Sequence, residues 1–402
     1  MTPYYDRGGV TVYAGDCREV MAGMGSGSVD AVVCDPPYEL GFMGKSWDSS
    51  GVAYRRETWE AVLRVLKPGG HLLAFGGTRT VHRMTVAIED AGFEVRDTVM
   101  WLYGSGFPKS LDVSKAIDKA AGAEREVVAP NLNFRQNKEA HGNAIMRPRV
   151  AGEAEVRTAP ATDDAREWDG WGTALKPAHE PIVVARKPLS STVAANVLEH
   201  GTGALNIDAA RIAGEVPSVP QPAYGGKADG VGLFGTGTGR NGEMSSAPLG
   251  RWPANVVLDP EAGAALDRQT GEGTSRIGKP RGAASGDGWG MTATGAEYDD
   301  SGGASRFFYC AKASKADRPR TADGTTHPTV KPVNLMRWLV RLVTPPGGTV
   351  LDPFAGSGST LVAATIEGFE AVGIEQEPDY LAIIADRLSQ PIAPVLDFGG
   401  DT

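Results

Sequence analysis

Two repeating patterns of apolar and polar residues organise the first hundred residues of the chain. Apolar runs of strand length alternate with segments that have helical spacing. These patterns predict strands over 10–14, 29–34, 71–75 and 94–103, and helices over 17–24, 58–66 and 79–91. The second helix should end at Lys67-Pro68-Gly69-Gly70, because proline and paired glycines interrupt helices. Strands and helices in this alternation are typical of an α/β sheet with mostly parallel strands.

The same alternation returns near the C-terminal end. Helices are predicted over 334–343, 359–367 and 378–388, and strands over 349–352 and 370–374. In the middle, His179–Arg186 has a clear strand pattern. Residues 214–250 and 269–305 are rich in Gly, Ser, Ala and Pro, as are flexible loops and segments that order on a partner. We therefore expect one α/β domain that is divided between the two ends of the chain.

The composition is that of a globular protein. Of the 402 residues, 41% are apolar and 22% are charged, and no run of about 18 apolar residues predicts a membrane span. The first residues lack the basic and apolar regions of a secretion signal. Three cysteines without a CxxC pair argue against a disulfide framework or a metal site and indicate a reducing cytoplasm.

The formal net charge of −9 is unevenly distributed. Residues 105–320 contain 26 basic and 26 acidic residues, so the negative charge lies entirely in the two ends. A surface for a polyanion such as a nucleic acid is therefore expected in the middle of the chain, where Lys312, Lys315, Arg318 and Arg320 cluster. A solvated lysine-rich helix face would give the same pattern.

Two motifs follow predicted strands. The first, Asp35-Pro36-Pro37-Tyr38, comes directly after the strand over 29–34, and by itself it fits a turn that proline stiffens. The second, Asp352-Pro353-Phe354-Ala355-Gly356-Ser357-Gly358-Ser359-Thr360, joins the strand over 349–352 to the next helix. A glycine-rich turn at a helix start brings backbone N–H groups close to a ligand.

Glycine-rich turns of this kind bind three kinds of ligand in proteins, and two of them fit this turn poorly. A phosphate-binding loop needs a lysine at the helix start, which this turn lacks, and a dinucleotide fingerprint needs glycine where Leu361 stands. The third kind is a small cationic nucleoside. Glu375 follows the next predicted strand, 23 residues after Asp352, where an acid in a doubly wound sheet commonly holds ribose hydroxyls. The turn and Glu375 together favour a ligand that contains a nucleoside.

The two motifs, in this order, resemble those of the β class of amino-DNA methyltransferases, which methylate adenine N6 or cytosine N4 with S-adenosylmethionine. Three further segments agree: Gly15-Asp16-Cys17, HEPIVVAR, and His327-Pro328-Thr329-Val330-Lys331-Pro332. LKPAHEPIVVARKPL, RWPANVVLD and RFFYCAKASKADR resemble phage or prophage members. The likeness covers about residues 9–110, 176–187 and 325–390.

The resemblance implies a Rossmann-like S-adenosylmethionine-dependent methyltransferase fold, in which a mostly parallel sheet carries an antiparallel β-hairpin. Residues 1–187 would form the catalytic part, with a polar insertion over about 105–175. Residues 188–320 would form a Gly/Pro-rich target-recognition region, and residues 321–402 the cofactor-binding part. The implied partner is double-stranded DNA in the cytoplasm of a bacterial cell, whether host or phage encodes the enzyme. No membrane is implied, and the class allows a homodimer.

The first motif suits methylation of an exocyclic amine. Such an amine has two N–H donors and a lone pair delocalised into the ring, so it is a poor nucleophile. A carboxylate oxygen of Asp35 and the main-chain carbonyl of Pro36 would accept both hydrogens, and Pro37 holds that carbonyl in an extended conformation. Tyr38 offers a flat face to a flipped base. Transfer would be direct and in-line, because the sequence has no Pro-Cys nucleophile motif at this place. Cys34 precedes Asp35 within the strand and is expected to be a buried core residue.

The resemblance implies cofactor contacts by a larger set of residues: Asp16, Cys17, Asp35, Thr329, Lys331, Asp352, Phe354, Ala355, Gly356, Ser357, Gly358, Ser359, Thr360, Glu375 and Gln376. Structural alternatives stay open for several of them. Asp16 contacts the cofactor adenine or only caps the helix that starts at Cys17. Thr329 and Lys331 contact the methionine end or cap the following helix. Phe354 stacks near the adenine or packs in the core.

Other conspicuous residues are expected to be structural. His179 and Glu180 open a strand, and Trp101, Trp171 and Trp252 are expected in the core.

Aspartate at the first position of the first motif favours adenine N6, since cytosine-N4 members more often carry Ser or Thr there. Cytosine N4 is the alternative. A non-catalytic protein that binds S-adenosylmethionine or DNA is a second alternative, which the intact motif argues against. Protein glutamine methylation is a further alternative, which Asp35 argues against, because those enzymes carry Asn rather than Asp before Pro-Pro. Because no restriction-nuclease motif is found, we expect a solitary methylase.

Overall fold

The computed structural model describes residues 1–40, 46–106, 110–130, 156–212, 250–274, 300–311 and 330–390. The chain divides into two compact units. The larger unit contains Met1–Gly104 and His179–Thr402, and the smaller unit contains Ser105–Ala178. Among the described residues, no helix is both long and apolar enough to cross a membrane. Thr329, one of the expected cofactor residues, lies outside the described residues.

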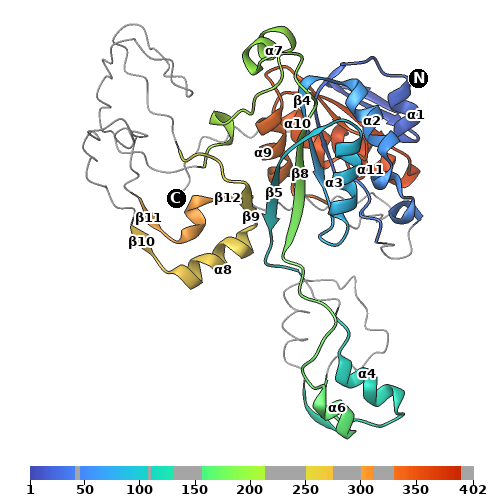
Figure 1. Cartoon of the computed structure of the whole chain (residues 1–402), viewed down its shortest axis with the longest axis vertical. Helices are drawn as coiled ribbons and strands as arrows, with labels where there is room; N and C mark the ends of the chain where they lie inside the picture. Colours follow the sequence, from blue (N-terminus) through green and yellow to red (C-terminus); the bar gives the residue numbers. More distant parts are fainter. Residues whose placement is uncertain are drawn as a thin grey trace. The chain divides into compact units, whose positions relative to one another are not determined.

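A ten-stranded sheet forms the centre of the larger unit (Figure 1), in the order β1-β2-β14-β13-β3-β4-β8-β5-β9-β12. The strands are β1 (Tyr5–Arg7), β2 (Val10–Ala14), β3 (Val29–Cys34), β4 (Leu66–Phe75), β5 (Glu94–Leu102), β8 (His179–Arg186), β9 (Val256–Leu258), β12 (Tyr309–Cys310), β13 (Thr349–Asp352) and β14 (Glu370–Glu375). The five strands from β2 to β4 are parallel, whereas β1 and β8 pair antiparallel with their neighbours. The predicted α/β class, with a mostly parallel sheet, is confirmed.

Helices cover both faces of this sheet (Figure 1). One face carries α1 (Cys17–Ala22), α2 (Arg56–Val65) and α3 (Val81–Asp90), and the other carries α9 (Val333–Val343), α10 (Ser359–Ile366) and α11 (Pro378–Ser389). Successive side chains of β3 explain the two layers, since Val33 packs in the cluster with α9 and α10 while Val32 packs with α1 to α3. All six residues of β3 are buried, and five of them are apolar; the exception, Asp30, forms an ion pair with Lys67.

The larger unit contains further described elements outside the central sheet and its two helical layers. They are α7 (Val193–His200), α8 (Pro260–Thr270), β10 (Gly273–Thr274), β11 (Ser301–Gly302) and the 3-10 helices η2 (Ser46–Ser49), η3 (Val52–Tyr54), η4 (Asp208–Ala210) and η5 (Ala304–Phe307). The apolar pattern predicted neither β9 nor β12, which continue the sheet in parallel beyond β5. The assignment of residues 188–320 to target recognition stays a prediction.

The start of β4 differs from the prediction. A helix end at Lys67–Gly70 and a strand from His71 were expected, but β4 begins at Leu66, directly after α2. Val29 pairs with Leu66 and Ala31 pairs with His71, so the extra residues of β4 bulge out of the ladder. Gly69 permits this bulge because its φ is +77°. Proline and glycine therefore interrupt the register here without ending the strand.

The expectation that the tryptophans lie in the core was wrong for two of them. Trp252 is 65% exposed and Trp171 is 60% exposed, whereas Trp101 is half-buried. The guanidinium of Arg211 lies 5.5 Å from the centre of the Trp252 ring. Aromatic rings stacked on arginine tolerate the surface because the contact is electrostatic as well as apolar. Large apolar size alone therefore did not predict burial.

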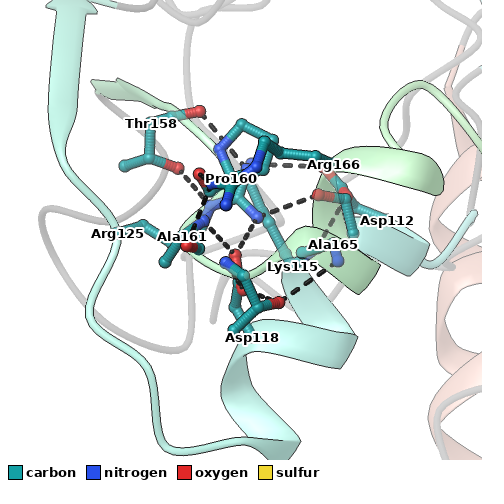
Figure 2. A network of polar contacts seen from close by, with 11 residues as sticks. Asp112, Lys115, Asp118, Arg125, Thr158, Pro160, Ala161, Ala165 and Arg166 are labelled. Carbon is teal, nitrogen blue, oxygen red and sulfur yellow. Dashed lines mark hydrogen bonds and ion pairs between the residues drawn. The ribbon is translucent and has the colours of Figure 1, made fainter.

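The smaller unit is organised around one buried carboxylate (Figure 2). It contains α4 (Val113–Ala120), β6 (Val127–Pro130), β7 (Val156–Thr158) and α6 (Asp163–Glu167). Asp118 of α4 accepts hydrogen bonds from Arg125 at 2.7 Å and from the backbone N–H groups of Ala161 and Thr162 at 2.9 Å. Burial would raise the pKa of Asp118, but these donors together lower it to about 2. This carboxylate joins the segments before and after residues 131–155.

Candidate active site

The carboxyl ends of three parallel strands bring three acidic residues to one edge of the sheet. Asp35 follows β3, Asp352 ends β13 and Glu375 ends β14. The register aligns these strand ends, since Leu351 pairs with Val32 and Asp352 pairs with Gly373. Crevices outside the carboxyl ends of strands are the usual ligand sites of open α/β sheets. The two motifs, more than three hundred residues apart in sequence, therefore belong to one site.

A buried lysine links the first motif to two other elements. Lys331, two residues before α9, is 7% exposed. Its Nζ lies 2.7 Å from Asp35 Oδ2, 3.2 Å from Tyr38 Oη and 3.2 Å from Glu180 Oε2. Tyr38 Oη in turn donates a hydrogen bond to Glu180 Oε2 at 3.0 Å. Four side chains from β8, the start of α9 and the turn after β3 thus form one polar cluster.

The two oxygens of Asp35 have different surroundings. Oδ2 accepts the hydrogen bond from Lys331, whereas Oδ1 is buried and has no hydrogen-bond partner among the described residues. A buried oxygen without a partner is costly, by roughly 1–3 kcal/mol, so such atoms are uncommon unless a ligand satisfies them. Asp35 therefore presents one oxygen that can accept a hydrogen from a ligand.

Tyr38 is held through its side-chain hydroxyl and through its main-chain carbonyl. Its hydroxyl binds Glu180, and its main-chain carbonyl accepts hydrogen bonds from Tyr54 Oη at 3.1 Å and Thr80 Oγ1 at 3.0 Å. The next residue, Glu39, has a φ of +56°, a backbone conformation that non-glycine residues rarely adopt. Rare backbone conformations persist where their surroundings enforce them, and they cluster at functional sites.

Buried Asp48 provides part of that enforcement. Its two carboxylate oxygens accept the backbone N–H groups of Glu39 at 3.0 Å and Leu40 at 3.2 Å. The turn after Tyr38 is thereby closed onto η2. Together with Tyr54 and Thr80, Asp48 fixes the direction in which the first motif leaves the sheet.

The charges of the cluster favour an ionised lysine. Burial opposes the charge of Lys331, but the carboxylates of Asp35 and Glu180 outweigh burial and raise its pKa above the usual value. Burial, followed by the same two carboxylates, raises the pKa of Tyr38 well above the usual value, so its phenol keeps its proton. Two carboxylates and one ammonium leave the cluster with a net negative charge.

The second motif forms a tight turn between β13 and α10. Gly356 and Gly358 have φ values of +51° and +78°, which glycine adopts without strain. Gly358 also begins α10, and a Cβ atom there would lie 3.2 Å from the side chain of Ile384. Glu375 Oε2 accepts the N–H of Gly356 at 2.7 Å, and Asp352 Oδ2 accepts the hydroxyl of Thr360 at 2.5 Å. The two acids therefore hold the shape of the turn.

Both of these acids have strongly raised pKa values. Burial raises the pKa of Asp352 to about 7 and that of Glu375 to about 7, although hydrogen bonds to each carboxylate oppose the shift. Asp35 and Glu375 contribute further to the shift of Asp352 by repulsion between like charges. A nearby cation would stabilise the charged forms of these acids, which burial disfavours, so the cluster suits a cationic ligand. The donor set therefore fits the positively charged sulfur of S-adenosylmethionine.

The other predicted cofactor residues have local roles in the structure. Asp16 caps α1 by accepting the N–H of Arg18 at 2.8 Å and also forms an ion pair with that side chain. Cys17 is buried, and burial raises its pKa to about 12. Phe354 packs against the cluster of α1 to α3, and its ring centre lies 6.4 Å from that of Trp59.

The rest of the second motif is mostly buried. Ala355, Ser357, Ser359 and Thr360 are buried, whereas Gln376 is exposed just beyond β14. Arg387 of α11 supports the turn by donating a hydrogen bond to the main-chain carbonyl of Ser357 at 2.7 Å. All of these residues lie near one strand edge, but which of them contact a cofactor stays a prediction.

Sequence reasoning missed Glu180, which was expected to be structural. A signal for it exists: β8 is apolar except near its ends, and a strand that pairs antiparallel with β4 begins where β4 ends. A carboxylate at the start of such a strand therefore lies at the ligand edge. Asp48, Tyr54 and Thr80 carry no comparable signal, because irregular segments bring them to the site.

Comparison with known proteins shows which family this chain resembles. The model of a DNA methylase family, N6_N4_Mtase, matches residues 29–386. The type II methyltransferase M.HindIII of Haemophilus influenzae is 24% identical over 83% of this chain and 67% of its own length. M.ScaI of Streptomyces caespitosus is 35% identical over 19% of this chain and 25% of its own length. The chain thus spans about a quarter of the first curated relatives that it matches.

Among solved structures, the PvuII DNA methyltransferase, which is cytosine-N4-specific, is 16% identical with a TM-score of 0.45, and the match covers 99% of this chain and 90% of that one. A likeness at this level does not bear on which base this chain methylates. The family match, in contrast, covers most of the chain and includes both motifs and the residues of the polar cluster. S-adenosylmethionine is the methyl donor of that family. The chain therefore belongs to the N6/N4 DNA methylase family.

Proposed function

We propose that this protein is a cytoplasmic, site-specific DNA methyltransferase that transfers a methyl group from S-adenosylmethionine to the N6 amine of adenine in double-stranded DNA. The observation that carries the proposal is the asymmetry of Asp35. Lys331 binds Oδ2, while Oδ1 is buried without a partner among the described residues. An exocyclic amine supplies the missing N–H donor.

The first motif prepares the amine for attack. Asp35 Oδ1 accepts one hydrogen of the amine and the carbonyl of Pro36 accepts the other, which draws the nitrogen lone pair out of the ring. The ring of Tyr38, fixed through Glu180, Tyr54 and Thr80, stacks on the flipped base. Such stacking contributes about 1–3 kcal/mol and offsets part of the cost of base flipping. As the nitrogen gains the methyl group it gives up one proton, which Asp35 Oδ1 accepts and passes to solvent. The rate derives from positioning and electrostatics, with no covalent intermediate on the enzyme.

The second motif holds the cofactor. S-adenosylmethionine supplies the methyl group from a positively charged sulfur. The glycine turn lets the backbone at the start of α10 approach the cofactor closely. Glu375 accepts the ribose hydroxyls, and Asp352 adds negative charge to the site. Asp16, Lys331 and Phe354 lie at the same strand edge and line the remainder of the site.

Adenine is preferred to cytosine because an aspartate precedes Pro36-Pro37. Cytosine N4 presents the same two hydrogens, so the free oxygen of Asp35 suits both bases. The test is mass spectrometry of nucleosides from the DNA of a methylation-free host that expresses the protein. We expect N6-methyldeoxyadenosine. N4-methyldeoxycytidine would overturn the choice of base, and the absence of both from DNA would overturn the proposed function.

The raised pKa values of Asp352 and Glu375 predict that cofactor affinity depends on pH. Below pH 7 both acids are largely protonated and neutral, and above pH 7 both are ionised and attract the sulfonium. S-adenosylhomocysteine lacks the transferred methyl group, and its sulfur is therefore uncharged. Calorimetry at pH 6 and 8.5 should give a preference for S-adenosylmethionine over S-adenosylhomocysteine that rises about tenfold with pH. An unchanged ratio would contradict a role of these acids toward the charge.

A further inference from the structure

We propose that Glu180 is a positioning residue of this active site, acting through Lys331 and Tyr38. This inference rests on the proposed function, because it concerns how the first motif is prepared for the amine. It assigns a role to a residue outside both motifs, on a strand that runs opposite to those carrying them.

The backbone around Glu180 is fixed on both sides. Glu180 pairs with Trp101 of β5, and the next residue, Pro181, accepts the N–H of Gly76 at 2.9 Å, directly beyond the end of β4. Its side chain is 21% exposed and points its Oε2 at two donors. A carboxylate anchored in this way can direct the groups that it binds.

The first group that Glu180 directs is the ammonium of Lys331. An ammonium has three hydrogens, and this one lies within 3.2 Å of three acceptors: Asp35 Oδ2, Tyr38 Oη and Glu180 Oε2. Without Glu180, Asp35 would be the one anionic partner of Lys331 within the described residues. A lysine with a single carboxylate partner is free to bridge both of its oxygens. Glu180 therefore keeps Lys331 on Oδ2 and leaves Oδ1 for the amine.

The second group is the hydroxyl of Tyr38. It donates its hydrogen to Glu180 Oε2 at 3.0 Å and accepts one from Lys331 at 3.2 Å. Both hydrogen-bonding functions of the hydroxyl are thereby used, which holds the outer end of the ring in place. A stacking ring that is already oriented loses less entropy when the base arrives. Glu180 thus prepares the amine acceptor and the stacking face together.

The test compares Glu180→Gln and Glu180→Ala with Glu94→Gln in the full-length protein. Glu94 is a matched control, because it forms an ion pair with Arg186 across the same two strands at their opposite end. We expect kcat for DNA methylation to fall about tenfold in Glu180→Gln, which keeps an acceptor, and about a hundredfold in Glu180→Ala. KM for DNA should change less than threefold, and Glu94→Gln should behave as wild type.

The pH profile provides a readout that a merely structural role would not move. The titratable groups that face Lys331 are Asp35, Glu180, Tyr38 and, further away, Tyr103. Removing the charge of Glu180 removes one of the two carboxylates that raise the pKa of Lys331. The ammonium of Lys331, followed by NMR of its side chain, should therefore lose its proton at lower pH in Glu180→Gln than in the wild type, and its titration should stay in place in Glu94→Gln.

A double substitution separates the two routes of action. In a Tyr38→Phe background, which keeps the ring and removes the hydroxyl, Glu180→Gln should have a smaller effect than in the wild type, because part of its role is already lost. Wild-type kcat and an unmoved titration of Lys331 in folded Glu180→Gln would overturn this inference alone. A wild-type protein that methylates no DNA would overturn the proposed function as well, so the two failures are distinguishable.

Discussion

Replacement of Asp35 by alanine is expected to remove methyl transfer and to leave cofactor binding largely in place. The carboxylate holds Lys331 with one oxygen and presents the other, buried and without a partner among the described residues, to the amine. Without it, no anionic acceptor draws the nitrogen out of conjugation, and Lys331 keeps Glu180 as an anionic partner but loses the carboxylate that presents an oxygen to the amine. We expect the rate to fall by at least about 10³-fold.

Single-turnover methylation of DNA, with saturating cofactor, measures this loss directly. Asp35→Asn is the second variant, since it preserves the volume of the side chain and removes its charge, and it should be nearly as inactive. Asp6→Ala, which removes an exposed acid of β1, is the control and should be fully active. The affinity for S-adenosylmethionine should weaken less than about tenfold, because Asp352 and Glu375 remain. More than a tenth of wild-type activity in Asp35→Ala would rule out the proposed role.

Substitution of Gly358 by valine is expected to abolish cofactor binding. The φ of +78° is strained for any residue with a Cβ atom, by about 1–2 kcal/mol, and a branched side chain there would also collide with Ile384. Relief of this strain would shift the turn, and with it the N–H of Gly356 that Glu375 now accepts. Since that movement opens the site, the dissociation constant should rise at least about a hundredfold.

Gly368 offers a matched control for the backbone strain. It has the same φ of +78°, follows α10 by two residues, and a Cβ atom there would meet nothing within 4 Å. Gly368→Val should therefore lower stability and leave cofactor affinity near that of the wild type in calorimetry. Glu375→Gln should weaken binding through the same turn without new bulk. Undiminished affinity in both Gly358→Val and Glu375→Gln would place the cofactor elsewhere.

Local patterns predicted the central elements of the sheet well. β2, β3, β8 and β13 have the predicted bounds, because each contains a cluster of β-branched and other apolar residues with a buried centre or a buried face. β9 and β12 were missed, since strands of two or three residues leave no period to detect. The bulge in β4 was missed for a different reason: Pro68 and Gly69 can end an element or only shift its register, and the partner strand decides which.

The sequence by itself determined the chemistry that the site can carry. A carboxylate and two prolines directly after a buried strand, and a glycine turn with an acid one βα unit later, limited the class of reaction and of cofactor. Each motif consists of adjacent residues, so the sequence contains all the side chains and backbone preferences that form it.

Only the tertiary structure decided which groups surround that chemistry. Lys331 and Glu180 lie 151 residues apart in the chain, yet their side chains meet because β8 runs opposite to β4 and begins where β4 ends. Electrostatic and hydrogen-bonding partners are selected by distance in space, which sequence separation does not report. The same register leaves Asp35 Oδ1 buried and, among the described residues, without a partner, and on that atom the proposed reaction depends.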